Sequence, residues 1–300
     1  MKIDSVLIYG MGLMGGSLAL SIQNQFPDTK ISAVVRSSKS KMEIKNRNLA
    51  NEVFLSDEFL NSRSWFEYDL VIFATPVHTI LETIKTIPVS GEGNTIFIDL
   101  GSTKQTIVAN VKVHFSDFSH NYVSTHPMCG SEHVGPESAI ADLYKNKLCI
   151  LTRIPGVRQS AFEFVEFFWS KIGAWTTEMD ADKHDETLAY VSHLPHILSS
   201  LLVFVAGSNE VTISEVKKNP RPITGGGFRD MSRIAGSNPE MWISIFQENQ
   251  NYIYQSLDRI TEELAVLKQV FNPNSKLDEN FIRSLWESAA AKKEIIQKNK

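Results

Sequence analysis

The sequence predicts an α/β fold: a Rossmann-type, doubly wound and mostly parallel sheet, followed by an all-α domain. Three observations support this prediction. The first half of the chain alternates short β-branched runs with polar, helix-capable stretches, as a parallel sheet with crossover helices requires. A glycine-rich turn separates the first apolar run from the first helical stretch. Beyond about Asp180 no convincing strand pattern remains, and apolar residues recur at helical spacing.

Seven short apolar runs are the candidate strands of the first half. Helices are expected after the first glycine turn, after Ser38, after the Pro76-Val77-His78 segment, after Thr103 and over residues 156–172. We therefore expect a dinucleotide-binding domain over residues 1–178 and a helical domain over residues 179–300. The predicted strands cover residues 5–9, 31–35, 70–74, 95–99, 122–124, 148–151 and 176–179.

A long apolar seam lies in the helical half. Its residues follow a 3-4-3-4 rhythm, which places them on one face of a long helix. The seam is either ordinary core or a subunit interface, because a helical domain of this size often completes its core against a second copy. The seam residues are Leu257, Ile260, Leu264, Leu267 and Phe271.

Composition narrows the class of protein. The chain has 300 residues, 42% of them hydrophobic, and a net charge of -4 with mixed signs, so nucleic-acid binding is not expected. Two cysteines make no disulfide framework. The apolar run over residues 194–206 is interpreted as a buried helix too short to span a membrane. No secretory signal is recognised, so we expect a cytoplasmic protein.

The N-terminal glycine turn is the predicted cofactor site. Gly10, Gly12 and Gly15 form a GxGxxG pattern between a buried strand and a helix, which is the context that gives this motif its meaning. Gly10 permits the tight turn, Gly12 lets the backbone approach a pyrophosphate, and Gly15 allows close helix–strand packing. Leu13 and Met14 lie in the same turn, at a helix N-terminus that favours phosphate.

The end of the second strand bears on the choice of nicotinamide. NAD sites usually carry an acidic residue about 20 positions after the glycines, but residues 33–39 contain no carboxylate. Arg36 and Ser37, with Ser38 and Lys39, can hydrogen bond a 2′-phosphate, so NADP is preferred over NAD. The alternative is a solvated basic loop.

Two further strand ends belong to the same expected pocket. Thr75 and Pro76 follow one strand, at the carboxyl edge where such folds bind ligands. Ser102 follows the next strand and can hydrogen bond near a nicotinamide. Lys104 is interpreted as a surface residue and given no chemical role.

His126 is the predicted catalytic base. It follows a strand and precedes Pro127, which favours an extended conformation in a loop. A histidine beside a nicotinamide can accept a hydroxyl proton as hydride leaves the same carbon. Glu132 on the same loop tunes that site or is a helix-start carboxylate.

The helical half contributes a second group of polar residues. His193 and His196 can share a helix face, but no carboxylate partner is evident, so no metal site is predicted. Arg229 and Arg233 follow a run of three glycines, and one of them can grip a substrate carboxylate by two hydrogen bonds.

Taken together, these segments resemble the prephenate dehydrogenase family, including its arogenate-using members. The resemblance extends from the glycine turn through DLGSTK, THPMCGSE and SHLPH to GGGFRDMSRIAGSNPEMW. It implies a nucleotide-binding domain, a helical dimerisation domain and hence a homodimer. It also implies oxidative decarboxylation of prephenate to 4-hydroxyphenylpyruvate, or of arogenate to tyrosine.

The same resemblance implies roles for individual residues. His126 hydrogen bonds the ring hydroxyl, with Ser102 as its partner near the nicotinamide. Arg233 holds a substrate carboxylate, and Glu132 acts in gating or specificity. His193 and His196 are substrate-site residues, with His196 preferred. The resemblance leaves prephenate and arogenate undecided.

Two rival functions share part of this sequence pattern. One is another NADP-linked oxidoreductase of the β-hydroxyacid dehydrogenase type, which usually works through a helical lysine. The second half of this chain offers histidines and arginines in its motifs instead. The other rival is a non-catalytic NADP-responsive binding protein, which has no need for Ser102, His126 and Arg233 together.

Overall fold

The computed structural model describes residues 2–89, 93–115, 120–130 and 135–297. The chain divides into two compact units, residues 1–250 and 251–300. The first unit contains the sheet, its covering helices and part of the helical half. The second consists of two helices. The expected domain boundary at residues 178 and 179 is not tested by this division and stays a prediction.

An eight-stranded sheet organises the first unit, in the order β3-β2-β1-β4-β5-β6-β7-β8. All neighbouring strands are parallel except β6 and β7. The order reverses between β1 and β4, which makes this the predicted Rossmann-type sheet. The strands are β1 Ser5–Tyr9, β2 Lys30–Val35, β3 Glu52–Leu55, β4 Leu70–Phe73, β5 Ile96–Asp99, β6 Tyr122–Pro127, β7 Leu148–Thr152 and β8 Trp175–Glu178.

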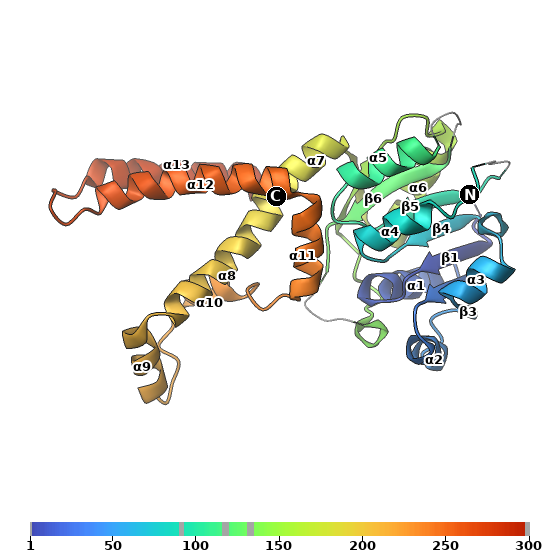
Figure 1. Cartoon of the computed structure of the whole chain (residues 1–300), viewed down its shortest axis with the longest axis horizontal. Helices are drawn as coiled ribbons and strands as arrows, with labels where there is room; N and C mark the ends of the chain where they lie inside the picture. Colours follow the sequence, from blue (N-terminus) through green and yellow to red (C-terminus); the bar gives the residue numbers. More distant parts are fainter. Residues whose placement is uncertain (1, 90–92, 116–119, 131–134, 298–300) are drawn as a thin grey trace. The chain divides into compact units, whose positions relative to one another are not determined.

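Helices cover both faces of this sheet (Figure 1). Leu18 of α1 and Phe168 of α6 belong to the apolar core on one face. Ile80 of α4 and Ile107 of α5 belong to the core on the other. The sheet is therefore doubly wound, as predicted. The covering helices are α1 Leu13–Gln25, α2 Ser38–Asn46, α3 Ser56–Ser62, α4 Val77–Ile84, α5 Gln105–His114 and α6 Gln159–Ile172.

All seven predicted strands are present, with ends shifted by at most three residues. The prediction missed β3 and α3. β3 has only four residues, of which Val53 alone is buried, so it carries too little apolar pattern to be recognised. The helix expected over residues 156–172 begins at Gln159, because Gly156 turns the chain with a φ of +94°.

The prediction that His126 lies on a loop after a strand was wrong. β6 continues through Pro127, and His126 pairs with Ile150 of β7. The amide of Met128 donates to the Leu148 carbonyl at 2.7 Å, so the amide-less nitrogen of Pro127 points toward β5. Pairing with β5 has already ended at Ser124. Pro127 therefore breaks no hydrogen bond of the sheet.

After β8 the described residues of the first unit form helices and connecting loops, without a further strand. Three segments join into one helix over Ala181–Gly207: α7 (Ala181–Leu188), a π-helical turn (Ala189–His193) and α8 (Leu194–Gly207). The remaining helices are α9 Glu210–Lys218, α10 Gly226–Ser232 and α11 Pro239–Glu248.

The expectation of a short, buried helix over residues 194–206 was wrong on both counts. Within the described residues, one helix, Ala181–Gly207, is long and apolar enough to cross a membrane by length and composition. Only Ser199 of α8 is buried, and the Phe204 side chain is 72% exposed. The run joins the preceding helix, and several of its apolar side chains, Leu201, Phe204 and Val205 among them, are exposed in the single chain.

The second unit comprises α12 (Gln250–Val270) and α13 (Glu279–Gln297). Ile253 and Ser256 of α12 are buried. Farther along the predicted seam, Leu264 is 52% exposed and Phe271 is 58% exposed. The ordinary-core interpretation therefore fails for the distal part of the seam.

Candidate active site

The glycine turn has the geometry that a dinucleotide requires. Gly10 has a φ of +100°, a left-handed conformation that favours glycine. A Cβ on Gly12 meets nothing within 4 Å, so the backbone there is open to a ligand. A Cβ on Gly15 would lie 2.0 Å from the Gly10 carbonyl oxygen, which excludes any side chain. The three glycines thus fit the pyrophosphate of a nicotinamide dinucleotide.

The helix behind this turn is held firmly in place. Gly12 is the N-cap of α1 and has no side chain to satisfy the first amides, which leaves them available to phosphate. Leu13 is buried, and the carbonyl of half-buried Met14 accepts a hydrogen bond from the Tyr144 hydroxyl at 2.7 Å. The turn is therefore a supported structure rather than a loose loop.

The other predicted cofactor residues lie at the same carboxyl edge. Thr75 follows β4, and its buried hydroxyl has no hydrogen-bond partner within the described chain. Pro76 is the exposed N-cap of α4. Ser102 follows β5 and is half-buried. An unpartnered buried hydroxyl at a ligand edge is typical of a site that a bound molecule completes.

Arg36 and Ser37 follow β2 and are both exposed. The Ser37 hydroxyl accepts a hydrogen bond from the Ser40 amide at 3.2 Å and so caps α2. The two side chains therefore lie where β2 ends and a helix begins. This position suits a ribose substituent of a dinucleotide whose phosphates rest on α1.

His126 shares this edge with the glycine turn. β1 and β6 are separated by three strand spacings, about 14 Å. The register aligns Tyr9, Phe73, Asp99 and Ser124 across the sheet. His126 therefore extends two residues beyond the level where the glycine turn begins, within reach of one bound dinucleotide.

His126 belongs to a hydrogen-bonded chain that enters the helical half. Its Nδ1 lies 2.8 Å from Nε2 of His184, and Nδ1 of His184 lies 2.7 Å from Oδ1 of Asp185. His184 and Asp185 are buried. The backbone amides of Lys104 and Gln105 donate to the Asp185 carboxylate at 2.8 and 2.9 Å. The start of α5, the start of α7 and the end of β6 are thereby tied together.

The prediction that Lys104 is a surface residue was wrong. Its side chain is completely buried, and Nζ donates to Asp99 Oδ1 at 2.6 Å. It also donates to the Ser124 hydroxyl and the Thr125 carbonyl, each at 2.9 Å. A buried charge persists only when paired in this way. Lys104 therefore fixes the backbone immediately before His126.

Burial keeps the histidines of this network neutral. It lowers the pKa of His126 well below the usual value, because a protonated His126 would be poorly solvated and would lie near His184 and the charged Lys104. It lowers the pKa of His193 to about 4, opposed by nearby Asp185. A neutral imidazole is the form that can accept a proton.

His193 and His196 have different surroundings. His193 is buried, and its Nδ1 lies 3.1 Å from the Asn249 amide nitrogen, which also donates to the Asp185 carbonyl. His196 is half-buried, with its ring centroid 4.0 Å from that of Trp242 on α11. The histidines therefore do not form a pair. No group of three metal-ligating side chains occurs in the described residues.

Two predicted substrate residues remain unplaced in this network. Arg233 follows α10 and is exposed, and within the described chain it makes no ion pair. Glu132 lies outside the described residues. The structure thus brings together the glycine turn, Thr75, Ser102 and His126, but supplies no contact of Arg233 with them.

Sequence reasoning missed the supporting residues Asp99, Lys104, His184 and Asp185. The segment Asp182-Lys183-His184-Asp185 has the composition of a solvated helix start, and only its contacts reveal that two of its residues are buried. One signal was available in the sequence: the polar segment from Asp99 to Lys104 at the end of β5.

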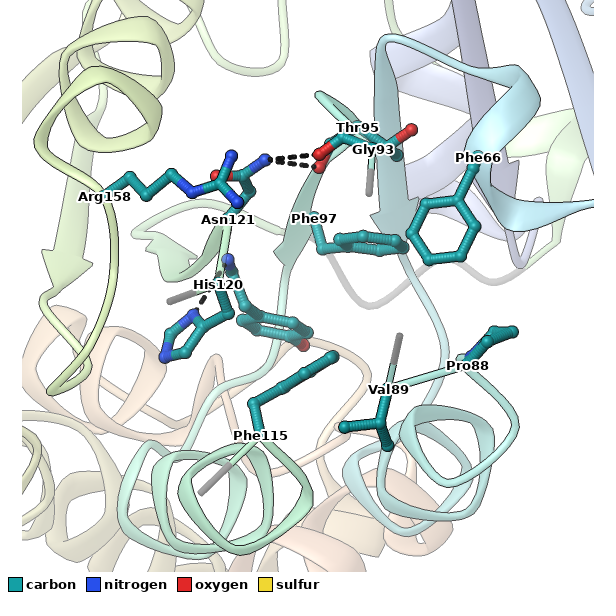
Figure 2. A pocket seen from close by; sticks show the side chains of 11 residues that line it. Phe66, Pro88, Val89, Gly93, Thr95, Phe97, Phe115, His120, Asn121 and Arg158 are labelled. Carbon is teal, nitrogen blue, oxygen red and sulfur yellow. Dashed lines mark hydrogen bonds between the residues drawn. The ribbon is translucent and has the colours of Figure 1, made fainter. Parts of the chain in front are cut away.

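A separate hollow lies at the opposite edge of the sheet (Figure 2). Phe66, Phe97 and Phe115 line it, together with His120 and Arg158. The residues at its sheet edge, Thr95 to Phe97 and Asn121 to Tyr122, lie at the amino ends of β5 and β6. Ligands of open α/β sheets bind at the carboxyl ends, so this hollow is not the active site.

A dinucleotide-binding turn on the same sheet edge as a neutral histidine defines the class: the chain is an NAD(P)-dependent oxidoreductase. Comparison with known proteins makes the assignment narrower. Residues 18–178 match the nucleotide-binding domain of prephenate dehydrogenase, and residues 180–287 match its dimerisation domain. The chain belongs to the prephenate dehydrogenase family.

Individual relatives agree with this assignment. The chain is 31% identical to the prephenate dehydrogenase of Bacillus subtilis, covering 88% of this chain and 69% of that one. It is 29% identical to the cyclohexadienyl dehydrogenase of Zymomonas mobilis, covering 88% and 87%. Prephenate dehydrogenase from A. aeolicus, solved with hydroxyphenyl propionate and NAD+, matches with a TM-score of 0.83 and 27% identity over 98% and 99% of the two chains.

Proposed function

We propose that this chain oxidatively decarboxylates a cyclohexadienyl acid with a nicotinamide dinucleotide: prephenate to 4-hydroxyphenylpyruvate, or arogenate to tyrosine. Membership of the prephenate dehydrogenase family supports this reaction. The observation that carries the site assignment is a neutral His126 on the sheet edge that holds the glycine turn.

The residues divide the chemistry in a simple way. A nicotinamide bound at the glycine turn would supply the hydride acceptor. His126 accepts the proton of the substrate hydroxyl, which pushes electron density toward the carbinol carbon and helps hydride to leave. Ser102, which follows β5, is proposed as a hydrogen-bonding partner of His126 near the nicotinamide. Loss of carbon dioxide leaves an aromatic ring, so the forward direction is strongly favoured.

Substrate binding is assigned to the helical half. Arg233 is exposed and has no carboxylate partner in the described chain, so its guanidinium is available for a substrate carboxylate. His196 is half-buried beside Trp242 and is preferred to the fully buried His193 as the group that meets the substrate. Glu132 keeps its predicted role in gating or specificity.

NADP is proposed as the preferred cofactor. Arg36 and Ser37 are exposed at the end of β2, where the ribose of a dinucleotide would lie, and no acidic residue stands beside them. We expect Arg36→Ala to raise the KM for NADP by about 10-fold or more, as loss of a charge-assisted hydrogen bond does. The KM for NAD should be little changed, and equal effects on both would remove the preference.

We also propose a cytoplasmic homodimer formed through the helical half. The name of the matching C-terminal family domain supports dimerisation. The exposed apolar side chains of α8, among them Leu201, Phe204 and Val205, are the kind of surface that a second copy covers. The long helix that contains α8 also contains His184 and Asp185, which are buried against the α/β region. This helix therefore packs on the folded protein at one end.

The deciding experiment is a steady-state assay of the purified full chain with prephenate and arogenate, each with NADP and NAD, following reduced cofactor and released carbon dioxide together. The proposal expects equal amounts of both products from at least one substrate. Reduced cofactor without carbon dioxide would favour an ordinary hydroxyacid dehydrogenase. Cofactor binding without any turnover would favour a binding protein.

A further inference from the structure

We propose that Asp185 and His184 are positioning residues that set the tautomer of His126, leaving its Nε2 unprotonated toward the substrate. The inference rests on the proposed function for its catalytic meaning, but its structural content does not. It follows from the order of donors and acceptors along one buried hydrogen-bonded chain.

The chain starts at a group that only accepts. Both oxygens of Asp185 receive backbone amide hydrogens, Oδ1 from Lys104 and Oδ2 from Gln105. Gln105 is the first residue of α5, so the carboxylate also lies at the positive end of a ten-residue helix. A carboxylate whose two oxygens both accept amide hydrogens acts as an acceptor in this chain of hydrogen bonds.

The tautomers then follow one after another. Nδ1 of His184 lies 2.7 Å from the Asp185 carboxylate and must donate to it. Burial lowers the pKa of His184, so the ring is neutral and its Nε2 carries no hydrogen. That Nε2 lies 2.8 Å from Nδ1 of His126, which must therefore donate. A neutral His126 with hydrogen on Nδ1 has a free lone pair on Nε2.

The surroundings of His126 reinforce this state. The charged and titratable groups near it are His184, His193 and Lys104, with Asp185 and Asp99 one contact farther. Lys104 is paired with Asp99 and fixes the Thr125 carbonyl just before His126. Within the described residues, no hydrogen bond engages Nε2 of His126. That nitrogen is the one atom of the ring left for a substrate.

The arrangement has a chemical consequence. When the substrate O–H bond breaks and an Nε2–H bond forms, His126 becomes an imidazolium. Its Nδ1–H already points at His184, whose ring is polarised by the Asp185 carboxylate, so the new charge is stabilised without movement of any side chain. A buried acid that orients a catalytic histidine works in the same way in serine proteases, where loss of the correct tautomer is costly.

The first test needs no mutation. Histidine side-chain nitrogens labelled with ¹⁵N distinguish protonated from bare ring nitrogens by NMR in the wild-type chain, with His126→Asn and His184→Gln used to assign the signals. We expect both His126 and His184 to carry hydrogen on Nδ1 and none on Nε2 near neutral pH. Hydrogen on Nε2 of His126 would overturn the proposal, whatever the activity of the protein.

The second test separates positioning from packing with two variants of matched shape. His184→Gln retains an acceptor oxygen near the former Nε2, whereas His184→Met fills similar volume without a strong acceptor. We expect His184→Met to lower kcat about 100-fold, in the range of general-base contributions, with KM little changed. His184→Gln should retain kcat within about 10-fold of wild type.

A purely structural role gives a different pattern, because a buried apolar side chain is tolerated at least as well as an unpaired amide. Equal losses in the two variants, or a better Met variant, would therefore contradict the proposal. Thermal melts confirm that both variants are folded. If neither folds, the NMR result alone decides. A wild-type chain that shows the expected tautomers but turns over no cyclohexadienyl acid would contradict the proposed function and leave this inference standing.

Discussion

The α/β region and the helical half of this chain differ in how completely they bury their apolar side chains. In the α/β region two apolar cores enclose the sheet, and even a buried lysine has three hydrogen-bond partners. In the helical half, α8 has a single buried residue and α13 has none. The first region encloses most of its apolar side chains within the single chain, whereas many of those in the second are exposed.

This difference affects what can be recognised in the sequence of each region. In the α/β region the candidate site residues are recognised locally, as glycines and polar residues at strand ends. The helical half shows mainly helical periodicity, apart from the two polar segments that contain His193, His196 and Arg233. His184 and Asp185 stand between the two, because they lie on a helix of the second region and are buried against the first.

The largest effect is expected at the residue that links the two regions. His126→Asn removes the proton acceptor and should lower kcat by about 10²- to 10⁴-fold, with KM within a few-fold of wild type. Steady-state kinetics measures both constants. His114→Asn, at the C-terminal end of α5 and hydrogen bonded through Nε2 to the Ile87 carbonyl, serves as the control and should leave kcat unchanged. Near-normal turnover by His126→Asn would remove it from the mechanism.

A pair of glycine variants tests the packing of the glycine turn in the α/β region. Gly15→Ala places a Cβ 2.0 Å from the Gly10 carbonyl, so we expect a loss of about 3 kcal/mol in the free energy of unfolding. Gly12→Ala meets nothing within 4 Å and should leave that free energy unchanged. Both should weaken dinucleotide binding. Denaturant melts and cofactor titration measure the two effects, and equal stability of both variants would contradict the packing described for the turn.

The buried histidines predict how stability changes with pH. The pKa of His193 is about 4 in the folded chain and near its ordinary value of 6.5 when unfolded. The unfolded state therefore binds the extra proton first, and stability falls as pH drops from about 6.5 to 4, by about 3 kcal/mol for this group. His193→Gln should reduce that fall in urea melts at pH 4.5 and 7. If the variant loses as much stability between pH 7 and pH 4.5 as the wild type does, His193 is not buried as described.

The smallest effect concerns the exposed face of the helical half. Phe204→Glu introduces a charge at a side chain that is 72% exposed in the single chain, so the fold should survive. If this face forms the dimer, the dissociation constant should rise about 30-fold or more. Sedimentation equilibrium measures it, with Val113→Glu of α5 as a control of similar exposure. Unchanged association of the Phe204 variant would exclude this face as the interface.

Much of the fold and part of the site could be predicted because their signals are local. The GxGxxG turn, the strand ends at Thr75 and Ser102, and His126 before Pro127 each depend on a few adjacent residues. β3 escaped because a four-residue strand with one buried side chain has almost no pattern.

The remaining misses have a different cause. Lys104 and Asp185 are charged residues in polar segments, and their burial depends in part on contacts with residues distant in sequence, such as Ser124 for Lys104 and the Lys104 amide for Asp185. The exposed state of α8 was unpredictable for the opposite reason, since its apolar run resembles that of a buried helix. Neither the partners of a buried charge nor the absence of a covering surface can be found in a local pattern.

The central claim is that His126 presents a bare Nε2 to the nicotinamide end of a dinucleotide whose pyrophosphate rests on the glycine turn. A crystal structure of the protein with bound NADP tests this most directly. We expect the pyrophosphate at the amide of Gly12 and the nicotinamide ring beside β6, with Nε2 of His126 directed at the ring. A ring bound away from β6, or a His126 Nε2 hydrogen bonded to the protein interior, would contradict it.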